Sequence, residues 1–304
     1  MSNFKLTLLL SFCSFFVLGQ ETSLVILGTA QDAGSPQIAC QKSCCKSLWE
    51  SGKKEGVVSL GLIDSMNQTH FLFEATPDIT QQLQSLKTEV GPTSHLGGVF
   101  LTHAHMGHYS GLMFLGKEAL GGDHIPVYTL ARMANYLKNN GPWEQLVEEK
   151  NIVLFPLVGS IPMQATPQLK VTPLVVPHRD EYSETAGYQI EGPNKIALFI
   201  PDIDKWEKWK FSLIDRISQV DYALIDATFF NGEELPNRDM SKIPHPFVIE
   251  SMELLKKLPV AEKKKVYFIH FNHTNPLLKE DSEATKEVIK QGYNIARTGL
   301  KLVL

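Results

Sequence analysis

The hydrophobic residues of this chain fall mainly in short runs that are rich in β-branched and aromatic side chains and end at turn-forming residues. Such runs indicate buried or half-buried β-strands. The predicted strands are Ser23–Leu27, Val57–Ile63, His70–Phe73, Gly98–Leu101, Val127–Leu130, Val153–Leu157, Val171–Val176, Gly187–Ile190, Ile196–Ile200, Tyr222–Ile225 and Val266–Ile269.

Longer amphipathic segments lie between these runs and predict helices. The predicted helices are Pro77–Thr88, Ser110–Glu118, Ala131–Asn139, Pro246–Lys257 and Ser282–Gln291. No repeat or low-complexity linker divides the chain. This mixture of strands and helices favours packed sheets with covering helices in a single domain.

The N-terminus departs from this pattern. Lys5 is followed by an apolar run, Leu6–Leu18, which is too short to span a bilayer but suits a secretory signal peptide. We therefore expect residues 1–19 to be a signal peptide and residues 20–304 to be the mature protein, exported to the bacterial periplasm or secreted. The alternative is a buried N-terminal helix.

Composition narrows the function. The chain has 304 residues, 43% hydrophobic and 20% charged, which excludes a disordered, collagen-like or polytopic membrane protein. Its formal net charge of −4 gives no basic excess for binding nucleic acid. The expected partner is a small-molecule substrate, with no nucleic acid, and no membrane after signal cleavage.

The cysteines are unusual for an exported protein. Cys13 would leave with the signal peptide, and Phe12 before it argues against a lipid anchor, which needs a small residue there. Cys40, Cys44 and Cys45 remain, an odd and clustered set instead of an even and dispersed one. Clustered thiolates favour a metal such as zinc. A disulfide from Cys40 to Cys44 or Cys45, with one free thiol, is the alternative.

Three histidines, His103, His105 and His108, follow the predicted strand Gly98–Leu101. Imidazole is a favoured ligand of zinc and iron, and a helix beginning just after His108 would bring its ring toward the other two. Further candidate ligands follow later strands: His178, Asp202, Asp226 and His270. Their common position at strand ends predicts one shared metal site.

This ordered set resembles the metallo-β-lactamase superfamily of binuclear metallohydrolases, over about residues 24–304. The resemblance implies an α+β fold, a four-layer αββα sandwich with the metals at one edge of two packed sheets. It also implies that His103, His105 and His178 hold one metal, that His108 and His270 hold the second, and that Asp202 bridges the two.

One position differs from the superfamily pattern. Where that pattern reads HxHxDH, this chain has Gly107 in place of the aspartate. The missing carboxylate would normally bind the second metal and orient the attacking water. The second metal would then bind weakly, be a different ion, or need another ligand. Glu74, at the end of an early predicted strand, is a residue that could lie nearby.

Within the superfamily, the stretches Leu27–Gln37 and His270–Pro276 resemble the branch of pyrroloquinoline-quinone biosynthesis protein B (PqqB). The cysteine cluster is also similar to that of the phosphonate-pathway cyclic phosphodiesterase (PhnP). That similarity implies a structural zinc on Cys40, Cys44, Cys45 and His273. The cysteine spacing differs from that relative's, and His273 could instead support the active site.

Asp226-Ala-Thr-Phe and the later His245 resemble the acidic residue and histidine that protonate the leaving group in the ribonuclease Z branch. The resemblance implies that Asp226, His245 and the bridging Asp202 are catalytic, with His245 as general acid. The alternative is that Asp226 caps a turn and His245 only precedes a helix.

Together these features predict an exported metal-dependent hydrolase, in which a hydroxide from metal-bound water attacks an ester-type substrate, foremost a phosphodiester, with a cyclic phosphodiester included in that class. We expect one or two zinc ions in the active site and one structural zinc, with iron or manganese as alternative active-site metals. A PqqB-like iron-dependent oxidoreductase and a non-catalytic metal-binding or ligand-binding protein are the competing functions.

Overall fold

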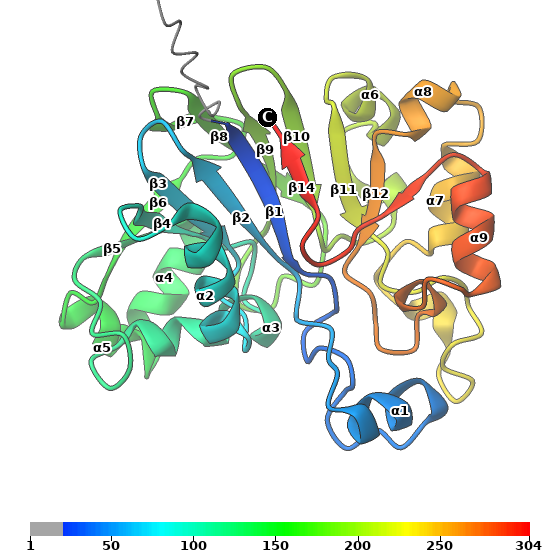
Figure 1. The fold of residues 1–304 in the computed structure, drawn as a ribbon, viewed down its shortest axis with the longest axis horizontal. Helices are drawn as coiled ribbons and strands as arrows, with labels where there is room; N and C mark the ends of the chain where they lie inside the picture. Colours follow the sequence, from blue (N-terminus) through cyan, green and yellow to red (C-terminus); the bar gives the residue numbers. More distant parts are fainter. Residues whose placement is uncertain (1–20) are drawn as a thin grey trace, which may run out of the picture.

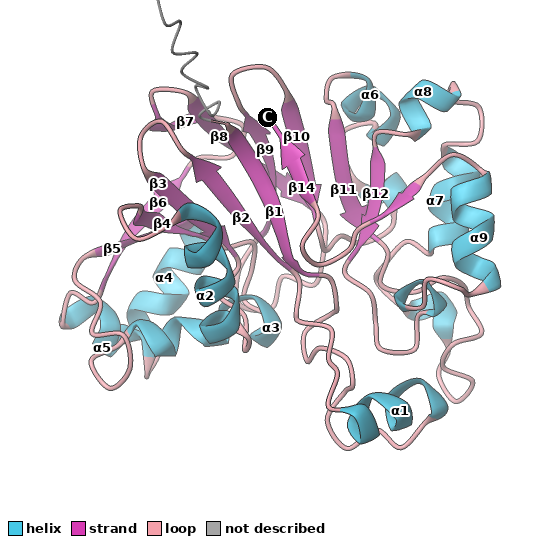
Figure 2. Cartoon of the chain, viewed as in Figure 1, coloured by secondary structure: helices cyan, strands magenta, loops and turns pink. Residues whose placement is uncertain are grey.

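The computed structural model describes residues 21–304 (Figure 1). Two seven-stranded sheets pack face to face, with helices on both outer faces (Figure 2). This is the predicted four-layer αββα sandwich, in one domain. The predicted signal peptide lies outside the described residues.

The first sheet has the strand order β14-β1-β2-β3-β4-β5-β6. Its strands are β1 (Thr22–Gly28), β2 (Ser59–Asp64), β3 (Thr69–Phe73), β4 (His95–Phe100), β5 (Ile125–Leu130), β6 (Ile152–Leu157) and β14 (Lys301–Val303). Pairing is antiparallel from β14 to β3 and parallel from β3 to β6.

The second sheet repeats this plan, with the order β13-β12-β11-β10-β9-β8-β7. Its strands are β7 (Met163–Thr166), β8 (Leu169–Val176), β9 (Thr185–Glu191), β10 (Ile196–Ile200), β11 (Tyr222–Asp226), β12 (Val266–Ile269) and β13 (Asn294–Ile295). Pairing is antiparallel from β7 to β10 and parallel from β10 to β13.

The helices cover the outer faces of the sandwich, and α1 projects from one edge (Figure 1). They are α1 (Ser43–Ser51), α2 (Ile79–Val90), α3 (Met106–Tyr109), α4 (Ala131–Asn139), α5 (Trp143–Glu148), α6 (Leu213–Ser218), α7 (Val248–Leu254), α8 (Val260–Lys263) and α9 (Glu283–Lys290). Short 3₁₀ helices occupy Ser110–Leu115, Trp206–Lys208, Met240–Lys242 and Pro276–Leu278. Within residues 21–304, none of the helices has the length and apolar character needed to cross a bilayer.

One strand prediction and one helix prediction need correction. The predicted helix Ser110–Glu118 is a 3₁₀ helix over Ser110–Leu115, and the α-helix α3 precedes it. His108 therefore lies inside a helix and not before one. The predicted strand Val57–Ile63 becomes β2 two residues later, because Val57 instead forms an isolated bridge to Ala30.

A layer of aromatic side chains fills the space between the sheets. Phe73 stacks on Phe100 with ring centroids 4.8 Å apart, and Tyr188 and Phe199 meet Phe73 edge-on. All four are fully buried, and burial of each contributes about 1.5–3 kcal/mol to folding. This rigid layer fixes the strand ends that carry the polar residues described next.

Candidate metal centre

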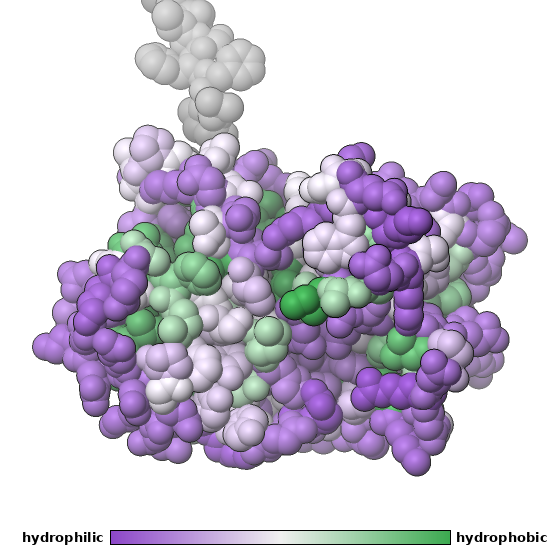
Figure 3. Space-filling model, turned by 90° about the horizontal axis from the view of Figure 1, so that it is seen from below, coloured by the Kyte–Doolittle hydropathy of each residue, from purple (hydrophilic) through white to green (hydrophobic). Residues whose placement is uncertain are grey.

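The candidate ligands lie in loops that follow strands at the lower edge of the sandwich in Figure 1. His103 follows β4, His178 follows β8, Asp202 follows β10 and His270 follows β12. Figure 3 views the molecule from this side and shows a mainly hydrophilic face with small apolar areas. Polar residues at these strand ends converge because parallel strands present their carboxyl ends to one edge.

The first group of ligands consists of His103, His105, His178 and Asp202, whose ligand atoms all lie within 4.8 Å of one another. His103 Nε2 is 3.4 Å from Asp202 Oδ2, and His178 Nε2 is 3.2 Å from Asp202 Oδ1. Two ligand atoms on one tetrahedral zinc are about 3.3 Å apart, since each bond is roughly 2.0–2.1 Å. His103 Nε2 and His105 Nδ1 are closer, at a hydrogen-bonding distance of 2.7 Å.

The second group lies on the other side of Asp202. His108 Nε2 and His270 Nε2 are 3.7 and 3.8 Å from Asp202 Oδ2. The structure also brings Asp32 to this group, with ligand atoms of Asp32, His108 and His270 within 4.8 Å of one another. Asp32 is a site residue that the sequence analysis missed. The available signal was its place just after the first strand, like the other ligands.

Several buried atoms in both groups have no hydrogen-bond partner within residues 21–304. They include both ring nitrogens of His178, Nε2 of His108, Nε2 of His270 and Oδ1 of Asp202. A buried polar atom without a partner costs about 1–3 kcal/mol. Nitrogen and oxygen donors that converge in this way fit a borderline metal such as zinc, which would satisfy them.

Three of the site's histidines have a protein group beside the ring nitrogen that faces away from Asp202. Thr102 Oγ1 is 2.8 Å from Nδ1 of His103, and Thr228 Oγ1 is 2.9 Å from Nδ1 of His270. Glu74 lies 3.1 Å from Nδ1 of His108. Glu74 is therefore near the second group, as considered from the sequence, but it contacts the ring nitrogen that faces away from Asp202. Such partners fix ring orientation in metal sites.

Electrostatics in the site depend on burial. Burial lowers the pKa of His178 to about 2, so its ring is neutral, the form that binds metals. Burial also raises the pKa of Asp202 to about 8, although His245 and His108 oppose the increase. The charged form of this carboxylate is costly without a cation beside it. For His108, burial is outweighed by Glu74, Asp32 and Asp202, which raise its pKa to about 9.

Asp226 and His245 form the predicted pair. Nδ1 of His245 lies 2.8 Å from Oδ2 of Asp226. The remaining acceptor positions of Asp226 are used by backbone N–H groups of Ile203 and Thr228 and by the Thr228 hydroxyl. Asp226 is thus fully hydrogen-bonded, unlike Asp202, although its ligand atom also lies within 4.8 Å of those of Asp202, His245 and His270.

A cavity of about 680 Å³ lies beside the pair. His245 lines it, together with Asp32 and His273. Two arginines, Arg179 and Arg238, and a lysine, Lys242, also line it. Arg179 places Nη2 3.1 Å from Nε2 of His105.

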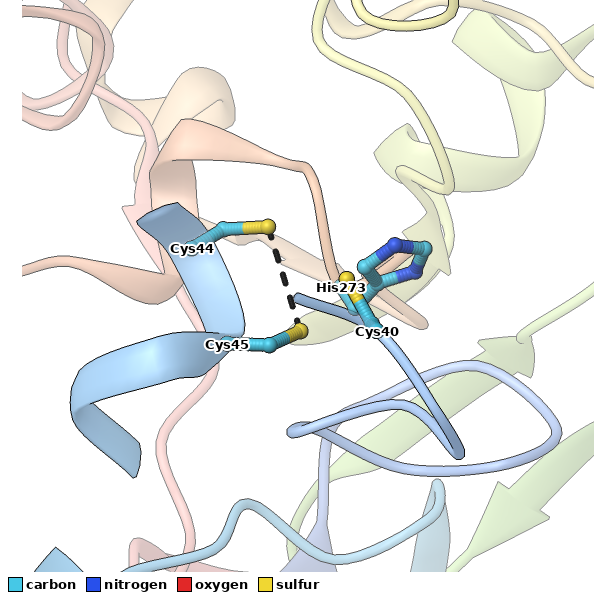
Figure 4. A group of neighbouring side chains, drawn as sticks. All are labelled: Cys40, Cys44, Cys45 and His273. Carbon is cyan, nitrogen blue, oxygen red and sulfur yellow. Dashed lines mark hydrogen bonds between the residues drawn. The ribbon is translucent and has the colours of Figure 1, made fainter. Parts of the chain in front are cut away.

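The cysteine cluster forms a second centre, shown in Figure 4. Cys44 and Cys45 lie on α1, Cys40 precedes that helix, and His273 approaches from the loop after β12. Their four ligand atoms lie within 4.8 Å of one another. The three cysteines are free, and the Sγ atoms of Cys44 and Cys45 are 3.9 Å apart. That separation is close to the roughly 3.8 Å expected for two thiolates on one tetrahedral zinc.

The structure therefore brings together every metal ligand predicted from the sequence, in two clusters. The set implied for the active site, His103, His105, His108, His178, Asp202 and His270, lies in the two groups on either side of Asp202, and the set Cys40, Cys44, Cys45 and His273 forms a separate group. The predicted disulfide alternative is not formed in the described chain.

Residues 69–271 match the family described as beta-lactamase superfamily domain. Proteins named coenzyme PQQ synthesis protein B match almost end to end. The protein from Methylobacterium sp. (strain 4-46) is 24% identical, with 92% of this chain and 99% of that protein covered. The protein from Methylobacillus flagellatus is 27% identical, with 92% and 99% covered.

Solved structures show the same fold. Zinc-bound PqqB from Methylobacterium extorquens superimposes with a TM-score of 0.76 at 24% identity, covering 93% of this chain and all of that one. A diphosphatase of the PhnP family has a TM-score of 0.64 at 20% identity, covering 93% and 97%. The family match covers well over half of the chain, and the protein is accordingly a member of the metallo-β-lactamase superfamily, of the PqqB-like kind.

Proposed function

We propose that this protein is a metal-dependent hydrolase that cleaves a small anionic ester, foremost a linear or cyclic phosphodiester. The observation that carries the proposal is the position of the Asp226–His245 pair. It lies directly beside a cluster of unpartnered histidine nitrogens and on the wall of a cavity large enough for a small molecule.

Active-site zinc would be held by His103, His105 and His178 on one side of Asp202, and by His108 and His270 on the other. A bound zinc would lower the pKa of a coordinated water to roughly 7, which supplies a nucleophile at neutral pH. Iron and manganese accept the same donor set and are the alternatives.

His245 would act on the leaving group. Its Nδ1 is engaged by Asp226, so the opposite ring nitrogen is the one available to a substrate in the cavity. Asp226 also stabilises the protonated ring by its charge. A protonated His245 can donate a proton to the departing oxygen, as a general acid.

The charges lining the cavity favour an anionic substrate. Arg179, Arg238 and Lys242 line it. Arg179 and Lys242 are paired with acidic residues, at 3.8 Å to Glu181 and 3.3 Å to Asp239. Arg238 makes no side-chain hydrogen bond or ion pair in the described part of the chain, which leaves its guanidinium available for a bidentate contact with a phosphoryl group.

Metal analysis of the purified protein tests the proposal. We expect two or more zinc equivalents per chain, of which His103→Ala and Cys44→Ala remove different portions. Wild type should then hydrolyse members of a phosphodiester and lactone panel, and His103→Ala should be inactive. Exposed Asp123→Ala serves as the control. A protein with full metal content and no turnover on the panel would contradict the hydrolase proposal.

The competing function implied by the sequence resemblance to the PqqB branch is an iron-dependent oxidoreductase. Iron could occupy the histidine and carboxylate ligands of the first group, and dioxygen rather than water would be the co-substrate. A purified protein with one tightly bound iron, no zinc at the cysteines, and substrate-dependent oxygen consumption would favour this function over hydrolysis.

Export is part of the proposal, with residues 1–19 as the signal peptide. The support is the charge and apolar run of that segment. Protein recovered from a bacterial periplasm should have Gln20 as its first residue, which N-terminal sequencing measures. Protein retained inside the cell with Met1 intact would contradict it.

A further inference from the structure

The surroundings of Gly107 identify a carboxylate that can replace the one missing from the second metal site. A Cβ atom built on Gly107 would lie 2.3 Å from the Cα of Asp32 and 2.6 Å from its Oδ1. Contacts this short do not occur between real atoms. Only glycine therefore fits at position 107 while the loop after β1, which carries Asp32, has its present conformation. The carboxylate of Asp32 occupies the space that a side chain at 107 would otherwise fill.

From this geometry we infer that Asp32 supplies the carboxylate ligand of the second active-site metal, in place of the aspartate that the superfamily motif has at position 107. Its Oδ1 lies 3.6 Å from Nε2 of His108. This separation is longer than a hydrogen bond but near that of two ligands on one metal. The inference rests on the proposed metal-dependent function and completes its second site.

The surroundings of Asp32 support a ligand role. Oδ1 of Asp32 is buried and has no hydrogen-bond partner within residues 21–304, and the same is true of Nε2 in both His108 and His270. Oδ2 of Asp202 lies 3.7–3.8 Å from both of those ring nitrogens. One cation among these four side chains would satisfy every one of the unpartnered atoms.

The loop after β1 is also hydrogen-bonded to the loop that carries His270. The Gln31 N–H donates to the carbonyl of Phe271, and the Phe271 N–H donates to the carbonyl of Thr29, each at 2.8 Å. Asp32 itself has a φ of 28°, a backbone conformation that aspartate and asparagine tolerate better than most residues. The carboxylate is thus positioned by backbone contacts that do not depend on its charge.

The decisive variant is Asp32→Asn, which keeps the shape and the backbone preference but removes the charge. Zinc binding is measured by titration and by metal analysis after dialysis, on full-length protein. We expect Asp32→Asn to lose one active-site zinc, through an affinity at least about 100-fold weaker, the upper end of the loss typical for residues that only orient a ligand. Its remaining active-site zinc and its cysteine-bound zinc should be unchanged.

A second variant tests the packing. Gly107→Ala removes no ligand side chain, but its methyl group would meet the Asp32 backbone, so it should displace the Asp32 carboxylate and weaken binding of the same zinc. Exposed Asp123→Asn is the matched control and should bind like wild type. Metal-free melting temperatures of all variants show whether each has folded.

The outcomes separate the two proposals. If wild type binds no metal at the histidines, the proposed function fails. If wild type binds two active-site zinc ions and folded Asp32→Asn binds both with the same affinity, the assignment of Asp32 is wrong while the proposed function stands. Loss of only the second zinc in Asp32→Asn supports both.

Discussion

Buried polar atoms around Asp202 divide into those with hydrogen-bond partners and those without. Asp226 accepts hydrogen bonds at both oxygens, whereas both ring nitrogens of His178 have no partner in the described residues. This difference separates two roles that the sequence cannot distinguish, because both residues lie at the carboxyl ends of predicted strands. Atoms already satisfied by the protein hold neighbouring groups in position, and unsatisfied atoms are available to a metal.

Removal of the His245 ring should therefore affect chemistry and not metal content. We predict that His245→Asn lowers kcat on an unactivated phosphodiester by roughly 10²–10⁴-fold, the usual contribution of a general acid. Asp226→Asn should act in the same direction, because the ring loses its orienting carboxylate. Bound zinc, measured by metal analysis, should stay at the wild-type level in His245→Asn.

The leaving group distinguishes this role from a structural one. A nitrophenyl ester has a leaving group that needs no proton, so His245→Asn should lose much less activity on it than on an alkyl ester. Equal losses on both substrates would show that His245 does not act as an acid.

At the scale of elements, the loops after strands carry strained backbone at the site. Glu74 after β3 and His270 after β12 have φ values of 71° and 70°, in the left-handed region that residues other than glycine rarely adopt. The loop after β12 also contributes to both groups of candidate ligands, since His270 belongs to the active-site group and His273 to the cysteine group. Strain of this kind persists only where surrounding contacts enforce it.

Strand β3 carries a buried histidine, His70, that is not part of either candidate metal site. His70 is 4% exposed, and its Nδ1 lies 2.8 Å from the Ser94 hydroxyl. Burial, together with the nearby Lys87 and His95, lowers the pKa of His70 to about 4. In the unfolded chain the pKa of a histidine is about 6.5.

This difference predicts a loss of stability in mild acid. Between pH 6.5 and 4 the unfolded chain binds a proton that folded His70 does not, so the free energy of unfolding falls as pH falls through that range. His70→Asn should remove on the order of 1–2 kcal/mol of this pH-dependent loss. Urea unfolding with a chelator present, at pH 7 and pH 4.5, measures it.

The chelator removes metal from both wild type and His70→Asn, so the site histidines contribute equally to the pH dependence of the two proteins. His124→Asn is the control, because the side chain of His124 is exposed. An unchanged pH dependence in His70→Asn would show that His70 is not the origin of the effect.

At the scale of the whole molecule, much of the fold follows from the pattern of apolar runs. All eleven predicted strands correspond to observed ones, and the histidine motif placed the metal centre at strand ends. Strand β13 was missed because it has only two residues, and helix α1 was missed because Cys45 is its one buried residue, so it carries no periodic apolar signal. Asp32 was missed as a ligand for another reason: its partner position, Gly107, is distant in sequence and is related to it only by packing.

The two halves of the sandwich meet at the metal centre, and each supplies ligands. His103, His105 and His108 come from the half that contains the first sheet, whereas His178, Asp202 and His270 come from the second. Neither half alone holds a complete site. Metal binding should consequently stabilise the packing of one sheet on the other, since only the assembled sandwich offers all the ligands.

The last strand, β14, returns to the first sheet and pairs with β1, where the Leu304 N–H donates to the carbonyl of Thr22 at 2.8 Å. The beginning and the end of the described fold thus lie side by side, at the edge of the sandwich opposite α1 (Figure 1). A short linker can join them while new ends are opened in a distant surface loop, which makes this chain suited to circular permutation.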